Sequence, residues 1–410
     1  MTTFTDLGTD PFFIQRLSAR NIYQPTEIQQ RVIPRLLAGE NLLFRSATGT
    51  GKTFAYLIPL FQRFLIPGSM DVKDGNAARS GPGPVILILA PTYELCSQIK
   101  QEADFLVHEA VHTQDAVQGL GPFHAPVQVS LIIGSANMSR QIDGLKKERP
   151  AVVVGNPARL LMLARMGKLR LDRIGALVLD EGDRLTVEEL AGETGDLLKR
   201  VNSRRQSAAC SATMSASSRE RLLPLLGGTA AFEETEEQEI LRERISHWAL
   251  FSEGRRKINT LGSFLMATGA KKALVFTNRG GQVGNIVSQL QYHRVPAVGL
   301  YGAMDKKHRK QAIDDFRAER ARVLVSSDLA ARGLDIPGIS HVIALDVSRD
   351  PEVYIHRAGR TGRAGRRGIM VSIGDGEEMQ DLAGLEKKLG IVVYPKVLYR
   401  GSICAPEPQN

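Results

Sequence analysis

The segment from Ser46 to Thr53 reads Ser-Ala-Thr-Gly-Thr-Gly-Lys-Thr, which has the composition and spacing of a phosphate-binding loop. Its glycines allow backbone N–H groups to turn toward phosphate oxygens, and the start of the helix expected after it adds partial positive charge. Lys52 can bind the β- and γ-phosphates, and the Thr53 hydroxyl can bind Mg²⁺. The general pattern has a glycine where this chain has Ser46. We therefore predict a nucleotide site formed by Ser46, Ala47, Thr48, Gly49, Thr50, Gly51, Lys52 and Thr53.

A phosphate loop requires an acidic residue farther along the chain, at the end of an apolar strand. The run from Ala176 ends in Asp180 and Glu181, which supply it. Asp180 can hold Mg²⁺, and Glu181 can orient and activate the attacking water. An acid pair at a strand end can also simply cap the next helix. The phosphate loop upstream favours the catalytic interpretation, so the two signals together predict an NTPase with Lys52, Asp180 and Glu181 as catalytic residues.

The segment Tyr354–Gly368 contains five arginines and no acidic residue. Arg360 and Arg363 are three residues apart, which suits a helical turn directed at one anion. Arginines from a second domain can stabilise the charge on a transferring phosphoryl group. A basic RNA-binding or localisation patch has the same composition. A phosphate loop elsewhere in the chain favours the first interpretation, with Arg360 and Arg363 as catalytic residues.

Short runs rich in Val, Ile and Leu alternate with longer helical patterns along the whole chain. The runs are not polar at alternate positions, which is typical of parallel strands covered on both faces. Two strand–helix series of similar length predict two tandem doubly wound α/β domains. The expected strands are Leu42–Phe44, Val85–Ala90, Val127–Ile133, Ala151–Val154, Ala176–Leu179, Ala208–Cys210, Trp248–Phe251, Ala273–Thr277, Ala297–Leu300, Val323–Ser326, His341–Leu345 and Ile369–Ile373.

The length of 410 residues fits two domains. We place the first at residues 1–226, a short linker at 227–244, and the second at 245–405. The linker contains the acidic run Glu233–Glu239, a composition that is also typical of a solvated face. Residues 67–84 and 112–126 are expected to be surface loops because they are rich in turn-forming residues.

The net charge of +9 is spread over both halves. A nucleic-acid backbone touching both domains would fit this charge, and so would a mildly basic soluble protein without such a ligand. The three cysteines, Cys96, Cys210 and Cys404, are far apart and odd in number, which indicates a reducing compartment. The sequence shows neither a signal peptide nor an apolar run long enough to span a membrane. These features predict a cytoplasmic protein.

The order of the motifs resembles that of the DEAD-box helicases of superfamily 2, from about Phe4 to Ile373. The resemblance implies two RecA-like domains and an ATP-dependent RNA helicase. The matching segments, in chain order, are Tyr23–Gln29 (Q motif), Ser46–Thr53 (I), Pro91–Leu95 (Ia), Gly134–Ser135 (double-glycine motif), Asn156–Arg159 (Ib), Asp180–Asp183 (II), Ser211–Thr213 (III), Val275–Thr277 (IV), Ser327–Asp335 (V) and His356–Arg363 (VI).

By this resemblance, Gln29 reads the adenine edge and Tyr23 stacks on the base, which implies ATP rather than GTP. Asp335 helps to bind ATP from the second domain. The resemblance also implies that Asp183, the last acid of motif II, hydrogen-bonds Ser211 and Thr213 of motif III, which couples hydrolysis to RNA handling. His356 is assigned to the same coupling group. The residues expected to contact RNA are Pro91, Thr92, Gly134, Pro157, Arg159, Arg309 and Ser327.

The chain departs from the family pattern in motif II and on the RNA side. Gly182 replaces the alanine of the family name, and both residues are small. Tyr93 replaces an arginine that the family places on RNA phosphate, and Lys306 can restore one such contact. Each lost phosphate contact weakens binding and lowers its salt dependence. The other RNA-side departures are Ser135, Asn156 and Ala158.

These features together predict an ATP-dependent RNA helicase with ATP and Mg²⁺ as cofactors. It would bind RNA across both domains through backbone and 2′-hydroxyl contacts, and locally unwind short duplexes or remodel RNA–protein complexes. An ATP-gated RNA clamp with little unwinding would use the same motifs. A DNA translocase of the same superfamily is disfavoured by the Q motif and Ser211–Thr213. A small-molecule kinase would explain the phosphate loop but not motifs IV to VI.

Overall fold

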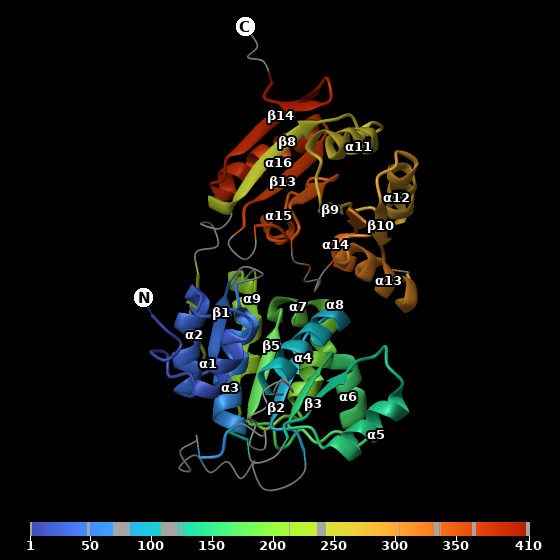
Figure 1. The fold of residues 1–410 in the computed structure, drawn as a ribbon. Coiled ribbons are helices and arrows are strands. Elements are labelled where there is room, and N and C mark those ends of the chain that lie inside the picture. Colours follow the sequence, from blue (N-terminus) through green and yellow to red (C-terminus); the bar gives the residue numbers. More distant parts are fainter. Residues whose placement is uncertain are drawn as a thin grey trace. The chain divides into compact units, whose positions relative to one another are not determined.

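The computed structural model divides into two compact units, Met1–Thr235 and Glu236–Asn410 (Figure 1). The division falls within the acidic run Glu233–Glu239. The structure describes residues 2–46, 50–68, 83–107, 122–123, 126–212, 214–235, 243–302, 304–331, 336, 338–362 and 366–406. Each unit is described by itself below.

The first unit contains a seven-stranded sheet in the order β3-β4-β2-β5-β6-β1-β7. All of its paired strands are parallel. The strands are β1 (Leu42–Arg45), β2 (Ile86–Leu89), β3 (Val129–Ile132), β4 (Val152–Gly155), β5 (Ala176–Asp180), β6 (Gln206–Ser211) and β7 (Ala231–Glu234). A helix lies in each connection between consecutive strands, and such crossover connections allow the paired strands to be parallel, as the doubly wound prediction requires.

Helices cover both faces of this sheet because its central strands are apolar on both sides. In β2, Ile86 and Ile88 pack in one core, whereas Leu87 and Leu89 pack in the other. The first core lies under α1 (Pro11–Ser18), α2 (Glu27–Leu37), α3 (Lys52–Leu65) and α4 (Tyr93–Val107). The second lies under α5 (Met138–Glu148), α6 (Pro157–Arg165), α7 (Gly182–Leu185), α8 (Glu188–Leu198) and α9 (Ala216–Leu222).

The second unit has an eight-stranded sheet in the order β10-β11-β9-β12-β13-β8-β14-β15, parallel except for the β14–β15 pair. Its strands are β8 (Ile245–Phe251), β9 (Ala273–Phe276), β10 (Ala297–Leu300), β11 (Val323–Ser326), β12 (His341–Ala344), β13 (Gly368–Gly374), β14 (Val393–Tyr399) and β15 (Ser402–Cys404). One face carries α11 (Lys257–Thr268) and α12 (Val283–Tyr292). The other carries α13 (Lys306–Arg317), α15 (Pro351–Ala358) and α16 (Gly376–Leu389), and α14 (Asp328–Ala331) follows β11.

The prediction of two doubly wound parallel-sheet domains is confirmed, and each expected strand is present. Strands β7, β14 and β15 were not predicted. β7 lies inside the segment expected to be the linker, where half of its residues are acidic. β14, the last strand but one in its sheet, is partly exposed and so lacks a continuous apolar run. Most of the two expected surface loops lies outside the described residues. None of the described helices has the length and apolar character needed to cross a membrane.

Candidate nucleotide-binding and RNA-binding sites

The phosphate loop connects β1 to α3 at the carboxyl edge of the first sheet. Its residues Ala47, Thr48 and Gly49 lie outside the described residues. Gly51 precedes α3 with a φ of +91°, in the left-handed region. A Cβ at this position would lie 2.4 Å from Nε2 of Gln29. The backbone angle and the close approach both require glycine here.

Gln29 is buried beside this loop rather than free at the surface. Its Nε2 donates to the Gly51 carbonyl at 3.1 Å, and its Oε1 accepts from the Thr26 backbone N–H at 3.0 Å. The second contact belongs to the capping box that begins α2. The side chain expected to read adenine therefore also connects the start of α2 to the phosphate loop. Tyr23, expected to stack on the base, is 66% exposed.

Ser46 lies at the centre of a hydrogen-bonded group within the loop. Its side chain is fully buried, and its Oγ is 2.7 Å from Oγ1 of Thr50. Thr235 Oγ1 donates to the same Ser46 Oγ at 3.0 Å. Nζ of Lys52 donates to the Ser46 carbonyl at 2.5 Å. The ammonium group expected to bind phosphate is thus held against the backbone of the loop.

Asp180 is the last residue of β5 and is almost fully buried. Its Oδ2 accepts from Oη of Tyr56 at 2.8 Å. Its Oδ1 accepts from the Glu181 backbone N–H at 2.9 Å and from Sγ of Cys210 at 3.2 Å. Glu181 has a φ of +50°, which is uncommon for a residue with a side chain and often marks a functional position.

The two side-chain donors to Asp180 remain protonated at neutral pH. Burial, reinforced by the charge of Asp180, raises the pKa of the Tyr56 phenol and of the Cys210 thiol well above their usual values. Burial also raises the pKa of the nearby Cys96 thiol to about 12. These thiols are therefore poor nucleophiles, and Cys210 can act only as a hydrogen-bond donor toward the carboxylate.

Asp183 lies in α7 and accepts a hydrogen bond at 2.6 Å from Oγ of Ser211, the last residue of β6. This is the contact that the sequence predicted between motifs II and III. Thr213, its expected second partner, lies outside the described residues. A Cβ at Gly182 would lie 3.1 Å from Cδ2 of Leu222 and 3.5 Å from Cβ of Ala209. An alanine would thus require Leu222 to shift slightly.

The donor set around Asp180 suits Mg²⁺. This cation commonly binds one or two carboxylates together with nucleotide phosphates, and it retains several waters. Asp180 and the Thr53 hydroxyl are oxygen ligands of this kind. Within the described part of the chain, no cluster of three or more His, Cys, Asp or Glu could hold a metal by itself. A metal held here would depend on the phosphates of a bound nucleotide.

The expected RNA contacts of the first unit follow the neighbouring strands β2, β3 and β4. Thr92 Oγ1 accepts from the Leu95 N–H at 3.3 Å and so helps to begin α4. Pro91 precedes it directly. Arg159 in α6 donates through Nη2 to the carbonyls of Gly134 at 2.5 Å and Ala136 at 3.4 Å. Pro157 is buried as the first residue of α6.

Two polar atoms near these residues are buried without a protein partner. They are Oδ1 of Asn156 and Nη1 of Arg159, which lie at the start of α6. Buried polar atoms normally have a hydrogen-bond partner, so atoms that lack one call for water or a ligand. Asn156 follows β4 and Gly134 follows β3. The two atoms without a protein partner therefore lie at the carboxyl edge of the sheet.

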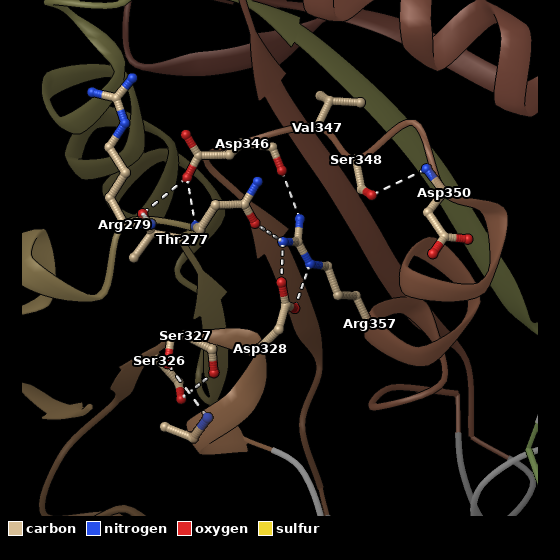
Figure 2. Close-up of polar contacts among 12 residues, drawn as sticks. Thr277, Arg279, Ser326, Ser327, Asp328, Asp346, Val347, Ser348, Asp350 and Arg357 are labelled. Atoms are coloured by element: carbon tan, nitrogen blue, oxygen red, sulfur yellow. Dashed lines mark hydrogen bonds and ion pairs between the residues drawn. The ribbon is translucent and has the colours of Figure 1, made fainter. Parts of the chain in front are cut away.

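Among the described residues of the second unit, Arg357 is a buried arginine that the sequence analysis did not single out. It is 2% exposed. Its Nε and Nη2 donate to the two carboxylate oxygens of Asp328 at 2.7 and 2.6 Å (Figure 2). Nη1 donates to the Asp346 carbonyl at 2.6 Å, and Nη2 also donates to Oδ1 of Asn278 at 2.5 Å. Arg357 thus joins the segments after β9, β11 and β12.

A spacing signal could have identified Arg357 as buried. Tyr354, Arg357 and Ala358 are the buried residues of α15 and follow i, i+3, i+4 spacing, so they share one face. Asp346, whose carbonyl accepts from Arg357, also accepts through Oδ2 from Oγ1 of Thr277 at 2.9 Å. The Asp346 contact is also visible in Figure 2.

Arg360, one of the two arginines expected to stabilise the transferring phosphoryl group, follows this helix. α15 ends at Ala358, so Arg360 lies in the following turn rather than in a helical turn as the sequence suggested. Its N–H donates to the Arg357 carbonyl at 3.0 Å, and its side chain is 8% exposed. His356 lies in the last turn of α15. Arg363 and Asp335 lie outside the described residues.

Ser327 and Arg309, the expected RNA contacts of the second unit, meet at the short helix α14. Oγ of Ser327 accepts from the Ala330 N–H at 3.4 Å, and Nη2 of Arg309 donates to the Ala330 carbonyl at 2.9 Å. The two residues come from different elements, Arg309 from α13 and Ser327 from the end of β11. Tertiary structure therefore brings together two residues that sequence analysis assigned to one function.

The chain has two doubly wound units, and one sheet edge of the first unit carries a lysine-containing loop and an acid pair. These features define the class of phosphate-loop NTPases. The DEAD/DEAH box helicase family model matches residues 26–222, and the model of the helicase conserved C-terminal domain matches residues 256–365. The chain belongs to the family of DEAD-box ATP-dependent RNA helicases.

Several known proteins are similar over nearly the whole chain. The DEAD-box ATP-dependent RNA helicase CshC of Bacillus cereus is 32% identical over 401 residues, which cover 97% of this chain and 94% of the relative. The ATP-dependent RNA helicase dbp8 of Schizosaccharomyces pombe is 32% identical, with coverage of 95% and 82%. The solved structure of S. cerevisiae Dbp5 bound to RNA and ADP BeF3 has a TM-score of 0.78, 25% identity and coverage of 96% of both chains.

Proposed function

We propose that this protein uses ATP hydrolysis to unwind short RNA duplexes locally or to remodel RNA–protein complexes. The observation that carries this proposal is that candidate residues for both ligands lie along the carboxyl edge of the first sheet. Candidate ATP-binding and catalytic residues lie at the ends of β1 and β5, the coupling residue Ser211 ends β6, and candidate RNA-binding residues follow β2, β3 and β4. Its relatives named ATP-dependent RNA helicases and the RNA-bound structure of Dbp5 support the assignment.

In the ATP site, Lys52 binds phosphate, Thr53 and Asp180 hold Mg²⁺, and Glu181 orients the attacking water. The metal, when bound, neutralises charge on the phosphate oxygens. Gln29 and Tyr23 contact the adenine. The segment Asp180–Asp183 is a variant motif II with glycine at position 182. Arg360, Arg363 and Asp335 contribute to the same reaction from the second unit.

RNA binds mainly through its backbone, with little dependence on sequence. In the first unit the contacts come from Pro91, Thr92, Gly134, Pro157 and Arg159, and the partnerless atoms of Asn156 and Arg159 support a ligand there. Ser327 and Arg309 contribute in the second unit. The hydrogen bond between Ser211 and Asp183, with Thr213 and His356, couples RNA binding to hydrolysis.

A second candidate function is an ATP-gated RNA clamp that rarely unwinds. Tyr93 favours it, because this side chain is 49% exposed where the family pattern has a cation. Weaker contact with RNA phosphate would leave less free energy for bending the bound RNA strand. Release of a labelled strand from a short RNA duplex separates the two functions, since only the helicase releases it faster with ATP than with a nonhydrolysable analogue.

We also propose the domain limits 1–226 and 245–405, joined by the segment 227–244, in which β7 adds a strand to the sheet of the first unit, and a cytoplasmic location. Cys96, Cys210 and Cys404 are free thiols, which suits a reducing compartment. Cell fractionation of the tagged protein tests the location.

Steady-state ATP hydrolysis with and without single-stranded RNA tests the main proposal. We expect strong RNA stimulation that is absent in Glu181→Gln, which keeps the size of the side chain but cannot activate water. Single-stranded DNA is the control ligand, since stimulation by DNA alone would indicate a DNA translocase. A rate of ATP hydrolysis that does not change when RNA is added would contradict the proposal.

A further inference from the structure

The carboxylate of Asp180 is oriented by two buried side chains on different elements. Tyr56 lies in α3, three residues after Thr53, and Cys210 lies in β6 directly opposite Asp180 in the paired strands. Both side chains are fully buried. Tyr56 Oη donates to Oδ2 at 2.8 Å, and Cys210 Sγ donates to Oδ1 at 3.2 Å.

Tyr56 also connects the two residues that would hold the metal. The Thr53 side chain lies next to the same hydroxyl that donates to Asp180. A carboxylate has about four acceptor positions. The Glu181 N–H, Cys210 and Tyr56 occupy three of them, which leaves capacity for a metal-bound water or the metal itself.

We propose that Tyr56 and Cys210 are positioning residues for the Mg²⁺ site, which hold Asp180 in its metal-binding orientation before nucleotide arrives. This inference rests on the proposed function, because it takes Asp180 and Thr53 as the Mg²⁺ ligands. A freely rotating Asp180 side chain would lose conformational entropy when it binds the metal. The two hydrogen bonds already restrict the side chain in the folded protein, so less entropy is lost on metal binding. Loss of a hydrogen bond to a metal ligand typically weakens metal binding by about 10- to 100-fold.

A purely structural role makes a different prediction. A buried tyrosine hydroxyl needs some partner, and a buried cysteine can act as a small apolar side chain. Cys96 provides the matched control, because it is also fully buried but its Sγ lies 3.6 Å from the Ala90 carbonyl. If Cys210 only fills space, replacing either cysteine with alanine should have the same effect on Mg²⁺ binding.

The experiment measures binding of a fluorescent N-methylanthraniloyl ADP to the full chain in EDTA and across a Mg²⁺ titration. The variants are Tyr56→Phe, Cys210→Ala, Cys210→Ser and Cys96→Ala, with Asp180→Asn as the reference for a damaged metal ligand. Tyr56→Phe removes one oxygen and keeps the ring, so the core remains filled. Circular dichroism melts establish that each variant is folded.

We expect Tyr56→Phe and Cys210→Ala each to raise the half-saturating Mg²⁺ concentration about tenfold, with affinity in EDTA unchanged. Cys210→Ser should stay close to wild type because its hydroxyl can donate, and Cys96→Ala should match wild type. The inference is overturned if Asp180→Asn shifts the Mg²⁺ titration but Tyr56→Phe does not. Binding by the wild type that does not depend on Mg²⁺ would overturn the proposed metal site and this inference together. If Cys210→Ala is unfolded, Tyr56→Phe alone decides.

Discussion

Thr235, the last residue of the first unit, donates a hydrogen bond of 3.0 Å to the side chain of Ser46, which begins the phosphate loop. Its own N–H donates to the Arg45 carbonyl at 3.1 Å. The two residues are far apart in sequence and meet because β7 pairs with β1. The segment that leaves the first unit is therefore attached to the loop expected to bind ATP.

Removal of this hydroxyl should weaken nucleotide binding as well as stability. Thr235→Val leaves the Ser46 hydroxyl with one side-chain neighbour fewer, and we expect a loss of about 1 kcal/mol in unfolding free energy. We also expect a few-fold weaker binding of a fluorescent ADP. Thr235→Ser retains the hydroxyl and should behave as wild type. Equal ADP affinity in the valine and serine variants would show that the contact has no effect on the loop.

Substitution of Gly51 should abolish nucleotide binding. Gly51→Ala places a methyl group against Gln29 and keeps a left-handed φ, so the loop and the Gln29 contact must both change. The strain costs about 1–3 kcal/mol. Isothermal titration calorimetry with ATP measures the loss of binding.

Gly262→Ala is the matched control for the Gly51 variant. Gly262 lies in α11, and a Cβ there meets no atom within 4 Å. We expect this change to stabilise the protein by about 0.5–1 kcal/mol because alanine favours helix. Normal ATP binding by Gly51→Ala would contradict the requirement for glycine in the loop.

Arg357 should be essential to the stability of the second unit. Arg357→Met leaves the Asp328 carboxylate without its bidentate partner, and breaking a buried pair costs about 3–5 kcal/mol. Arg357→Lys should restore little, because an ammonium group has three donors and no planar fork, whereas Arg357 makes four donations to three residues. Urea unfolding followed by Trp248 fluorescence reports on this unit. Arg349→Met is the comparison, since this exposed arginine pairs with Glu377 and Asp381 at the surface and should have no measurable effect.

His341 should make the second unit less stable as the pH falls. Burial lowers the pKa of its imidazole in the folded protein below the usual value of 6.5. The unfolded chain therefore binds a proton more readily, so the stabilisation is complete above pH 6.5 and is lost as the pH falls below it. His341→Gln should show a smaller decrease in stability between pH 7.5 and about 5 than wild type. Parallel curves for the two proteins would indicate that His341 does not contribute.

The class of fold, and the chain positions of all strands except β7, β14 and β15, could be predicted from the sequence. Runs such as Ile86–Leu89 are apolar at every position, and only a strand covered on both faces can bury all of these side chains. The phosphate loop and the acid pair were also predicted from the sequence, because spacing of a few residues is sufficient to define these local motifs. The hydrogen bond between Asp183 and Ser211 followed from their motifs.

Which distant side chains meet at these motifs depends on the three-dimensional fold. Tyr56, Cys210 and Asp180 come from α3, β6 and β5, and their contact depends on strand order, which the local pattern does not encode. Among the arginines, composition could not show that Arg357 is enclosed by three carbonyl or carboxylate partners and that α15 ends before Arg360. Burial depends on what packs against a residue from elsewhere in the chain, so it is fixed only when the sheet and its helices have assembled.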